Sequence, residues 1–164
     1  HVHTWSALLV LAGRCLRQMA PQRGIEWRIA KNPWPYTVLG ASDWKHYEIS
    51  IDVRIGERGG AGVLGHVVEG RPLKGCLFFV EASGRWHFFT GDAKVAEGNL
   101  ELDPTRWQRL GLRFQDGQMH ALLNGKVIQT AGEGSCATGL AGFACSWAPV
   151  LFDNLKIERV APGS

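Results

Sequence analysis

The clearest pattern in the chain lies within Tyr36–Ile55. In its second half every other residue is apolar: Tyr47, Ile49, Ile51, Val53 and Ile55. The residues that alternate with them are polar: His46, Glu48, Ser50, Asp52 and Arg54. A period of two over about ten residues is typical of a β-strand with one dry and one wet face. Such a strand needs a second sheet over its apolar face, and we expect the rest of the chain to supply it.

Short alternating segments separated by turn signals continue to the end of the chain. Cys76–Ala82 and Arg85–Thr90 predict a hairpin. The region Trp107–Thr130 predicts a three-stranded meander, because Asp116-Gly117 and Asn124-Gly125 are strong signals for two-residue hairpin turns. Turn signals recur about every eight to twelve residues, and no strand–helix–strand rhythm is present. The sequence therefore predicts an all-β fold, a two-sheet antiparallel jelly-roll sandwich.

The N-terminal residues 1–24 contain no acidic residue, unlike the rest of the chain. Within them Thr4–Ala20 is compatible with a short helix that ends before Pro21. We therefore predict an N-terminal extension, helix or loop, over residues 1–24 and a β-sandwich domain over residues 25–160. In an alternative, the apolar stripe of this extension replaces a missing strand or docks onto a second copy of the chain.

Composition fits one domain with neither a nucleic-acid partner nor a membrane span. The chain has 164 residues and a net charge of +3, and its 18 Lys and Arg are spread out rather than clustered, so no basic patch indicates nucleic acid. The apolar segment Ala7–Gly13 is far shorter than the ~20 residues of a membrane-spanning helix. It also lacks the basic flank and cleavage site of a signal peptide, so we expect a soluble chain.

The four cysteines are Cys15, Cys76, Cys136 and Cys145. They form no C-x-x-C pair, which argues against a zinc knuckle or a thioredoxin-like site. We expect buried free thiols. A Cys136–Cys145 or a Cys76–Cys145 disulfide stays open as an alternative, and so does the redox compartment.

An ordered series of motifs gives the chain a family resemblance. The series is W-x-x-Y-x-I-x-I-D-V-R-I, G-x-G-V-L-G-H-V, A-S-G-R-W, T-G-D, R-W-Q-R-L-G-L-R-F, L-N-G-K, G-L-A-G-F and F-D-N-L-K-I. It resembles a concanavalin A-like (laminin G/lectin-type) jelly roll, and more closely the C-terminal lectin domain of galactosylceramidase, glycoside hydrolase family 59. The resemblance covers roughly residues 16–158.

The resemblance implies a carbohydrate-binding domain without the family's catalytic carboxylates, which lie in a separate barrel. It also favours a secreted or extracytoplasmic location. Asp153 matches a family ligand position for a structural calcium. The acid-free residues 1–24 depart from the family pattern, so any further calcium ligands would come from backbone carbonyls or the Gly40–Asp43 turn.

Residue patterns argue against enzyme chemistry. A glycosidase needs two carboxylates about 5–10 Å apart. Glu48 and Asp52 share one strand face but are ~13 Å apart at a strand rise of ~3.3 Å per residue, so we interpret them as solvated positions. No G-x-S-x-G, P-loop or H-E-x-x-H motif occurs. We predict that the chain is not an enzyme and has no catalytic residue.

Sugar binding needs aromatic faces together with hydrogen-bonding groups. The Arg85-Trp86-His87 run supplies both, and alternation places Trp86 and His87 on opposite faces of the strand, one of which points outward. We predict a ligand site formed by Arg85, Trp86, His87, His66, Glu81, Trp34 and Trp147. For each tryptophan the alternative is packing in the core.

Two functions follow from these patterns. The first is a non-catalytic, lectin-like module that binds a glycan or polysaccharide. The second is a structural or protein-interaction β-sandwich without glycan affinity, which acts as an oligomeric scaffold such as a homodimer.

Overall fold

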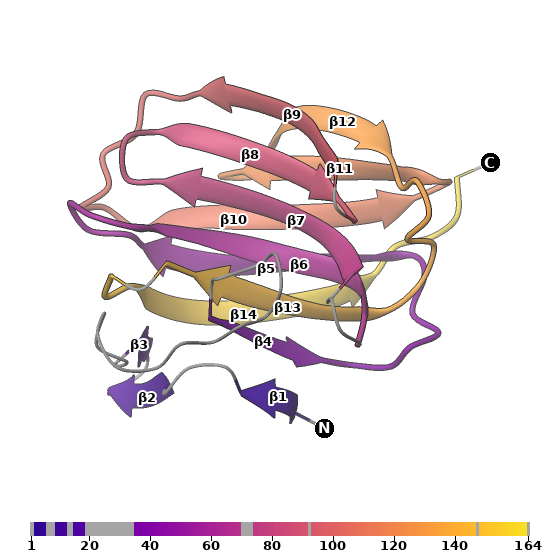
Figure 1. Ribbon diagram of the computed structural model, residues 1–164, viewed down its shortest axis with the longest axis horizontal. Helices are drawn as coiled ribbons and strands as arrows, with labels where there is room; N and C mark the ends of the chain where they lie inside the picture. Colours follow the sequence, from indigo (N-terminus) through magenta and orange to yellow (C-terminus); the bar gives the residue numbers. More distant parts are fainter. Residues whose placement is uncertain are drawn as a thin grey trace.

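The computed structural model describes the backbone of residues 2–5, 9–12 and 15–18 and the full structure of residues 35–69, 74–91, 93–146 and 148–163. Figure 1 shows two layers of strands. The strands are β1 (Val2–Trp5), β2 (Leu9–Ala12), β3 (Cys15–Gln18), β4 (Tyr36–Leu39), β5 (Tyr47–Arg54), β6 (Gly60–Val68), β7 (Lys74–Glu81), β8 (Arg85–Thr90), β9 (Ala93–Asn99), β10 (Gln108–Gln115), β11 (Gln118–Leu123), β12 (Lys126–Gly132), β13 (Leu140–Cys145) and β14 (Leu151–Arg159).

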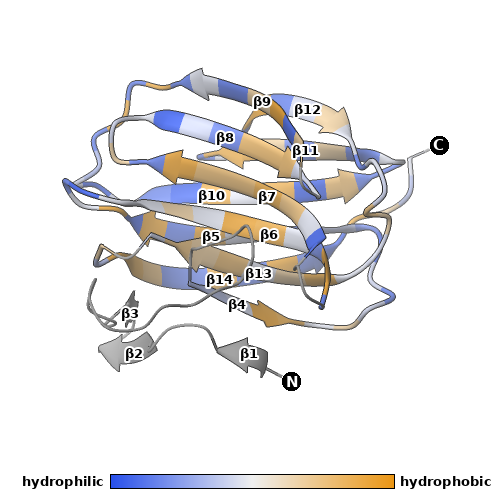
Figure 2. Ribbon diagram, in the orientation of Figure 1, coloured by the Kyte–Doolittle hydropathy of each residue, from blue (hydrophilic) through white to orange (hydrophobic). Residues whose placement is uncertain are grey.

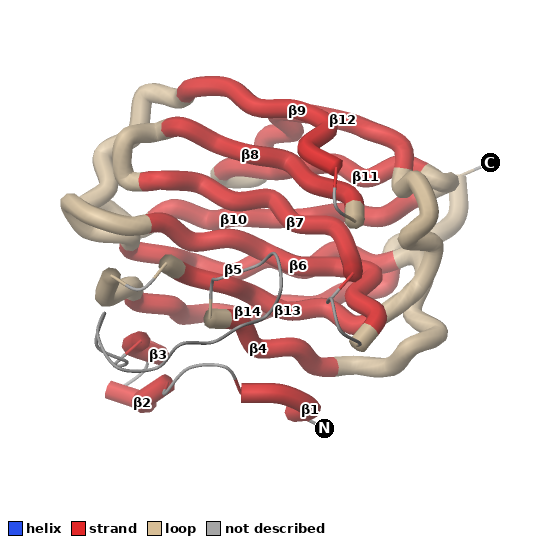
Figure 3. Tube along the Cα trace, viewed as in Figure 1, coloured by secondary structure: helices blue, strands red, loops and turns tan. Residues whose placement is uncertain are grey.

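Each layer is a seven-stranded sheet. Sheet A has the order β1-β4-β13-β6-β7-β8-β9, and sheet B has the order β12-β11-β10-β5-β14-β3-β2. All strand pairs are antiparallel. Figure 3 shows strands and loops and no helix in the described parts of the chain. Accordingly, these parts contain no helix long and apolar enough to span a membrane. The predicted two-sheet sandwich is confirmed.

The alternating segment forms β5, at the centre of sheet B between β10 and β14. Ile49, Ile51 and Val53 are at most 1% exposed. Their neighbours on β10 follow the same alternation, so that Leu112 lies opposite Ile49. Burying these side chains against sheet A is the main stabilising contribution to such a fold, at about 1.5–3 kcal/mol for each large apolar side chain.

The two predicted hairpin turns have the expected backbone. Asp116 and Gly117 have φ of 52° and 73°, and Asn124 and Gly125 have φ of 51° and 81°. Positive φ at both central residues matches a type I′ turn, whose twist suits the flanking strands. The turns fix the register of β10, β11 and β12.

The predicted helix over Thr4–Ala20 is wrong, because the described part of this segment is extended. β1 pairs with β4 in sheet A, whereas β3 pairs with β14 and β2 with β3 in sheet B. These pairings satisfy backbone groups of β4 and β14 that would otherwise form open sheet edges. A helix could not supply those hydrogen bonds, so tertiary pairing overrides the local helical compatibility. The alternative in which the segment adds strand to the sandwich describes the fold correctly.

Sheet A is apolar on both of its faces. Figure 2 shows hydrophobic residues concentrated along β6 and β7. One set faces the shared core, and a second buried cluster lies on the other side of the sheet: Val38, Leu64, Val67, Leu77, Phe79, Leu140 and Ala144. Tyr36 and Phe89 pack against this second cluster. Sheet B differs, because the outward side chains of β5 and β10 form ion pairs.

Three cysteines are free and buried: Cys76, Cys136 and Cys145. This confirms the predicted free thiols for these residues, and neither proposed disulfide forms. Burial raises the pKa of both Cys76 and Cys145 to about 12. Because only the thiolate is a good nucleophile, both side chains are inert near neutral pH in the folded protein.

We therefore expect iodoacetamide at pH ~8 to leave Cys76 and Cys145 unmodified in the native chain and to modify both in denaturant. Peptide mapping by mass spectrometry after each treatment measures this. Rapid native labelling of either peptide would contradict the buried placement.

Candidate functional site

The outward face of β8 carries the candidate site. Along this strand Trp86 and Phe88 point into the core, whereas His87 and Phe89 point to the other side of sheet A. The two-residue period of a strand makes these faces mutually exclusive. The His87 and Phe89 rings stack, with centroids 6.1 Å apart and planes at 26°.

Charged side chains from the neighbouring strands surround His87. Its Nε2 lies 3.2 Å from Glu81 Oε2 on β7, and its Nδ1 lies 3.7 Å from Glu97 Oε2 on β9. The Glu97 carboxylate also accepts hydrogen bonds of 3.0 Å from Arg85 and from Lys94. We name Glu81, Arg85, His87, Phe89, Lys94 and Glu97 the β8 cluster. Strands β7 and β8 thus bring together three of the predicted ligand residues, namely Glu81, Arg85 and His87.

The β8 cluster combines both signs of charge with an aromatic surface. The side chains of Glu81, Arg85, Lys94 and Glu97 are between 41 and 48% exposed. Hydrogen bonds from Lys94 and Arg85 lower the pKa of Glu97, so its carboxylate is ionised near neutral pH. The Lys94 ammonium also lies 5.8 Å from the centroid of the Phe89 ring, within cation–π range. The cluster therefore presents donors and acceptors next to aromatic carbon.

Sequence reasoning missed Lys94 and Glu97. The pairing of β8 with β9 shifts between Phe88 and Phe89, as it does at a β-bulge. A bulge changes which side chains of the two strands lie opposite one another. This shift cannot be read from the sequence, so the partners of His87 on β9 could not be derived.

Trp86 does not belong to the site, which corrects the prediction. Its side chain is in the core and only 7% exposed. The ring makes an edge contact with Phe78 at a centroid distance of 6.3 Å. It also packs directly on Gly98, where a Cβ atom would lie 2.7 Å from the indole. A ring enclosed in this way cannot stack on a sugar, so the alternative of core packing holds for Trp86.

His66 is also internal and does not join His87. It is fully buried, with its ring stacked on Phe114 at a centroid distance of 3.7 Å. Its Nδ1 and Nε2 each lie 2.7 Å from a backbone carbonyl oxygen, of Cys136 and Lys45 respectively. The pairing of β6 with β7 shifts between Gly65 and Val68, and His66 has a φ of 47°. This irregularity turns the side chain toward the core instead of the outer face.

Trp34 and Trp147, the other predicted ligand residues, lie outside the residues whose structure is described. Asp153 lies on β14, opposite Asp52 of β5, and its carboxylate accepts the backbone N–H of Asn154. Asp52 already accepts hydrogen bonds from Arg109 and Asn154. Calcium takes six to eight oxygen ligands, and the described residues contain no group of three or more candidate metal-binding side chains. These residues do not by themselves fit calcium, and the site stays a prediction.

Sheet B presents a different outer face. Arg109 lies 2.9 Å from Asp52 and also donates to Ser50, and Arg113 forms an ion pair with Glu48. These side chains satisfy one another across β5 and β10. Glu48 and Asp52 are therefore engaged in cross-strand ion pairs rather than placed as a catalytic pair.

Known structures share this fold. The carbohydrate-binding module CBM66 from Bacillus subtilis has a TM-score of 0.74 at 13% identity, with 94% of each chain covered. A B. subtilis protein of unknown function with a galectin-like fold has a TM-score of 0.75 at 9% identity, covering 97% of this chain and 89% of that one. Caenorhabditis elegans galectin LEC-6 has a TM-score of 0.56 at 9% identity, covering 87% of this chain and 96% of that one.

At these identities the structural matches establish the fold alone. No curated protein sequence matches the chain. Residues 11–160, however, match the family described as galactocerebrosidase, C-terminal lectin domain. That match spans nearly the whole sandwich, including every residue of the β8 cluster. The chain therefore belongs to the galactocerebrosidase C-terminal lectin domain family.

Proposed function

We propose that this protein is a non-catalytic glycan-binding module and that the β8 cluster is its binding site. The observation that carries the proposal is the position of His87, which stacks on Phe89 and lies within ion-pair distance of Glu81 and Glu97. Membership of a lectin-domain family supports the assignment to sugar binding.

The chemistry of the β8 cluster suits a sugar. Each hydroxyl group of a sugar both donates and accepts a hydrogen bond. Arg85 and Lys94 supply donors, whereas Glu81 and Glu97 supply acceptors, and all four are exposed enough to exchange partners. Aromatic carbon, such as that of Phe89, suits the apolar C–H face of a sugar.

The state of Glu97 supports a binding role over hydrolysis. A glycosidase requires a carboxylic acid with a raised pKa to protonate the leaving group. The pKa of Glu97 is instead lowered by hydrogen bonds from Lys94 and Arg85. Glu97 is therefore suited to accept hydrogen bonds from hydroxyl groups and not to donate a proton.

The test is a glycan-array screen of the native protein, followed by calorimetric titration of the best ligand into His87→Ala. We expect the substitution to weaken binding by about tenfold or more, because a hydrogen-bonding and stacking side chain is lost. His120→Ala is the matched control, since His120 is a partly buried histidine on β11 of the other sheet. Equal affinity of His87→Ala and wild type would reject the β8 cluster as the site.

A second candidate function, an oligomeric scaffold, is favoured by the strands that end the two sheets. β9 is a terminal strand of sheet A, which ends on its other side with β1, and β12 is a terminal strand of sheet B, which ends on its other side with β2. They carry two exposed apolar side chains, Val95 and Val127, at 42 and 41% exposure. Unpaired edge strands with apolar side chains are surfaces on which a second copy can pair. A blank array from folded protein, together with a dimer in light scattering, would favour this function over glycan binding.

A further inference from the structure

A cavity separate from the β8 cluster lies at the end of the sandwich where β4 and β14 finish and β5 begins. Its volume is about 630 Å³. It is lined by Leu39, Asp43, Trp44, Lys45, His46, Tyr47, Ile157, Glu158, Arg159 and Val160. In sheet A three strands, β13, β6 and β7, separate β4 from β8. The cavity is therefore independent of the β8 cluster, and its volume lies within the usual range for small-ligand pockets, about 300–1,000 Å³.

The indole of Trp44 gives this cavity a fixed aromatic wall. Its ring makes an edge contact with Tyr47 at a centroid distance of 5.7 Å. It also lies directly over Gly40, where a Cβ atom would be 2.5 Å from the ring. Gly40 has a φ of 105°, which other residues rarely adopt. Position 40 therefore requires glycine, because a side chain there would collide with the Trp44 ring.

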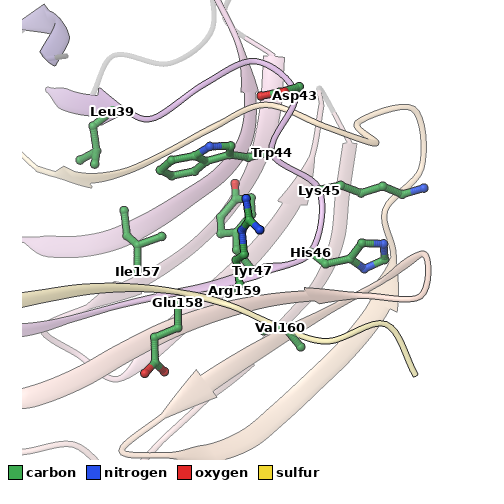
Figure 4. A pocket seen from close by; sticks show the side chains of 10 residues that line it. All are labelled: Leu39, Asp43, Trp44, Lys45, His46, Tyr47, Ile157, Glu158, Arg159 and Val160. Carbon is green, nitrogen blue, oxygen red and sulfur yellow. The ribbon is translucent and has the colours of Figure 1, made fainter. Parts of the chain in front are cut away.

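Arg159 brings an unpaired positive charge to the cavity. Figure 4 shows the Arg159 side chain beside that of Tyr47, on the same side of β14 as Ile157, whereas Glu158 points the opposite way. Glu158 forms an ion pair of 2.9 Å with Lys156. No carboxylate of the described residues lies within ion-pair distance of the Arg159 guanidinium, which is exposed. An exposed, unpaired guanidinium beside an indole is suited to bind a carboxylate with two parallel hydrogen bonds.

Other polar groups at the rim add hydrogen-bonding capacity. Lys45 and His46 extend from the loop before β5 in Figure 4. The Nδ1 atom of His46 is buried and has no hydrogen-bond partner among the residues that the structure describes. The Tyr47 hydroxyl is already engaged with the backbone N–H of His66 and the carbonyls of Gly139 and Leu140, so it helps to shape the cavity instead of contacting a ligand.

We infer that this cavity is a second carbohydrate site, which takes a sugar unit bearing a carboxylate, such as a uronic acid. The sugar ring packs on Trp44 and the carboxylate binds Arg159. Asp43, which also lines the cavity, provides an acceptor for a hydroxyl group. The inference extends the proposed sugar-binding function to a separate position and a different class of sugar.

The test compares two sugars that differ in charge. Methyl glucuronide and methyl glucoside are titrated separately into the isotope-labelled native chain, and NMR follows the Trp44 indole N–H and the Arg159 backbone N–H. We expect the glucuronide to shift both signals and to bind about tenfold more tightly than the glucoside, with its affinity falling as salt is added. Equal affinity for the two sugars, or unshifted signals with both, would overturn the inference.

Arg159→Gln removes the guanidinium from an exposed position, so we expect it to leave folding unchanged and to lower glucuronide affinity about tenfold. Arg54→Gln is the matched control, because Arg54 is an exposed arginine at the end of β5 that does not line the cavity. The NMR signals followed here belong to Trp44 and Arg159, so a failure at this cavity is distinguishable from a failure of glycan binding at the β8 cluster. Undiminished affinity in Arg159→Gln would show that the carboxylate binds elsewhere.

Discussion

Trp86→Ala is expected to lose about 3–5 kcal/mol of folding free energy, the usual cost of truncating a large buried aromatic side chain. The ring lies in the core, in edge contact with Phe78 and against Gly98. Removing it leaves a cavity that these neighbours cannot fill, because the two strands that carry them are held in register with β8. Urea unfolding followed by circular dichroism measures the loss as a lower midpoint.

His87→Ala is the matched comparison for this prediction. The two residues are adjacent on β8 but face opposite sides of sheet A. The His87 side chain is 13% exposed and lies close to two carboxylates, so we expect His87→Ala to cost about 1 kcal/mol of unfolding free energy, well below the loss in Trp86→Ala, while it weakens glycan binding. The pair thus separates a stability position from a binding position within one strand. A Trp86→Ala variant as stable as wild type would contradict the core placement of the indole.

His66→Ala is expected to destabilise the fold by about 3–5 kcal/mol, the cost of removing one member of a buried charged pair. Both ring nitrogens lie 2.7 Å from carbonyl oxygens, which only accept hydrogen bonds. A ring that donates to both carbonyls carries a positive charge. The Glu133 carboxylate, with its side chain 8% exposed, lies 3.9 Å from Nδ1 and supplies the opposite charge. The substitution leaves two carbonyls and this carboxylate without the imidazole.

A double-mutant cycle checks the pairing. Burial raises the pKa of Glu133, against the opposing electrostatic effect of His66, Lys45 and His46, so this carboxylate depends on its basic neighbours. We expect Glu133→Gln to cost less free energy in the His66→Ala background than in wild type, with a coupling of about 0.5–3 kcal/mol between the two sites. Strictly additive losses in urea unfolding would show that the two side chains do not act as a pair.

His66 also holds one of the loops that form the cavity beside Trp44. The two nitrogens of its ring form hydrogen bonds with the backbone carbonyls of Lys45 and Cys136, and so the ring links these two loops. Lys45 lines the cavity, together with Trp44 and His46 from the same loop. His66 is therefore a positioning residue for this loop, although its side chain is not among those that line the cavity.

The candidate site could be predicted only in part. Alternation along β8 was enough to place Trp86 and His87 on opposite faces, and the hairpin signal was enough to bring Glu81 close to His87. Which face of β8 points inward depends on the sheet that covers it. Because β8 carries aromatic side chains on both faces, its sequence does not reveal which face is buried. The choice of Trp86 as a ligand residue was wrong for that reason.

Local chemistry in the sequence determined the strand character of β5, the two type I′ turns and the two-sheet class, because each depends on residues close together in the chain. Tertiary structure alone decided the inward turn of His66, the approach of Glu97 to His87 and of Lys94 to Phe89, and the strands of the N-terminal segment. Each of these depends on a shifted register or on an open sheet edge supplied by a distant strand. Such pairings are set by contacts between strands, which the alternation within any one strand does not encode.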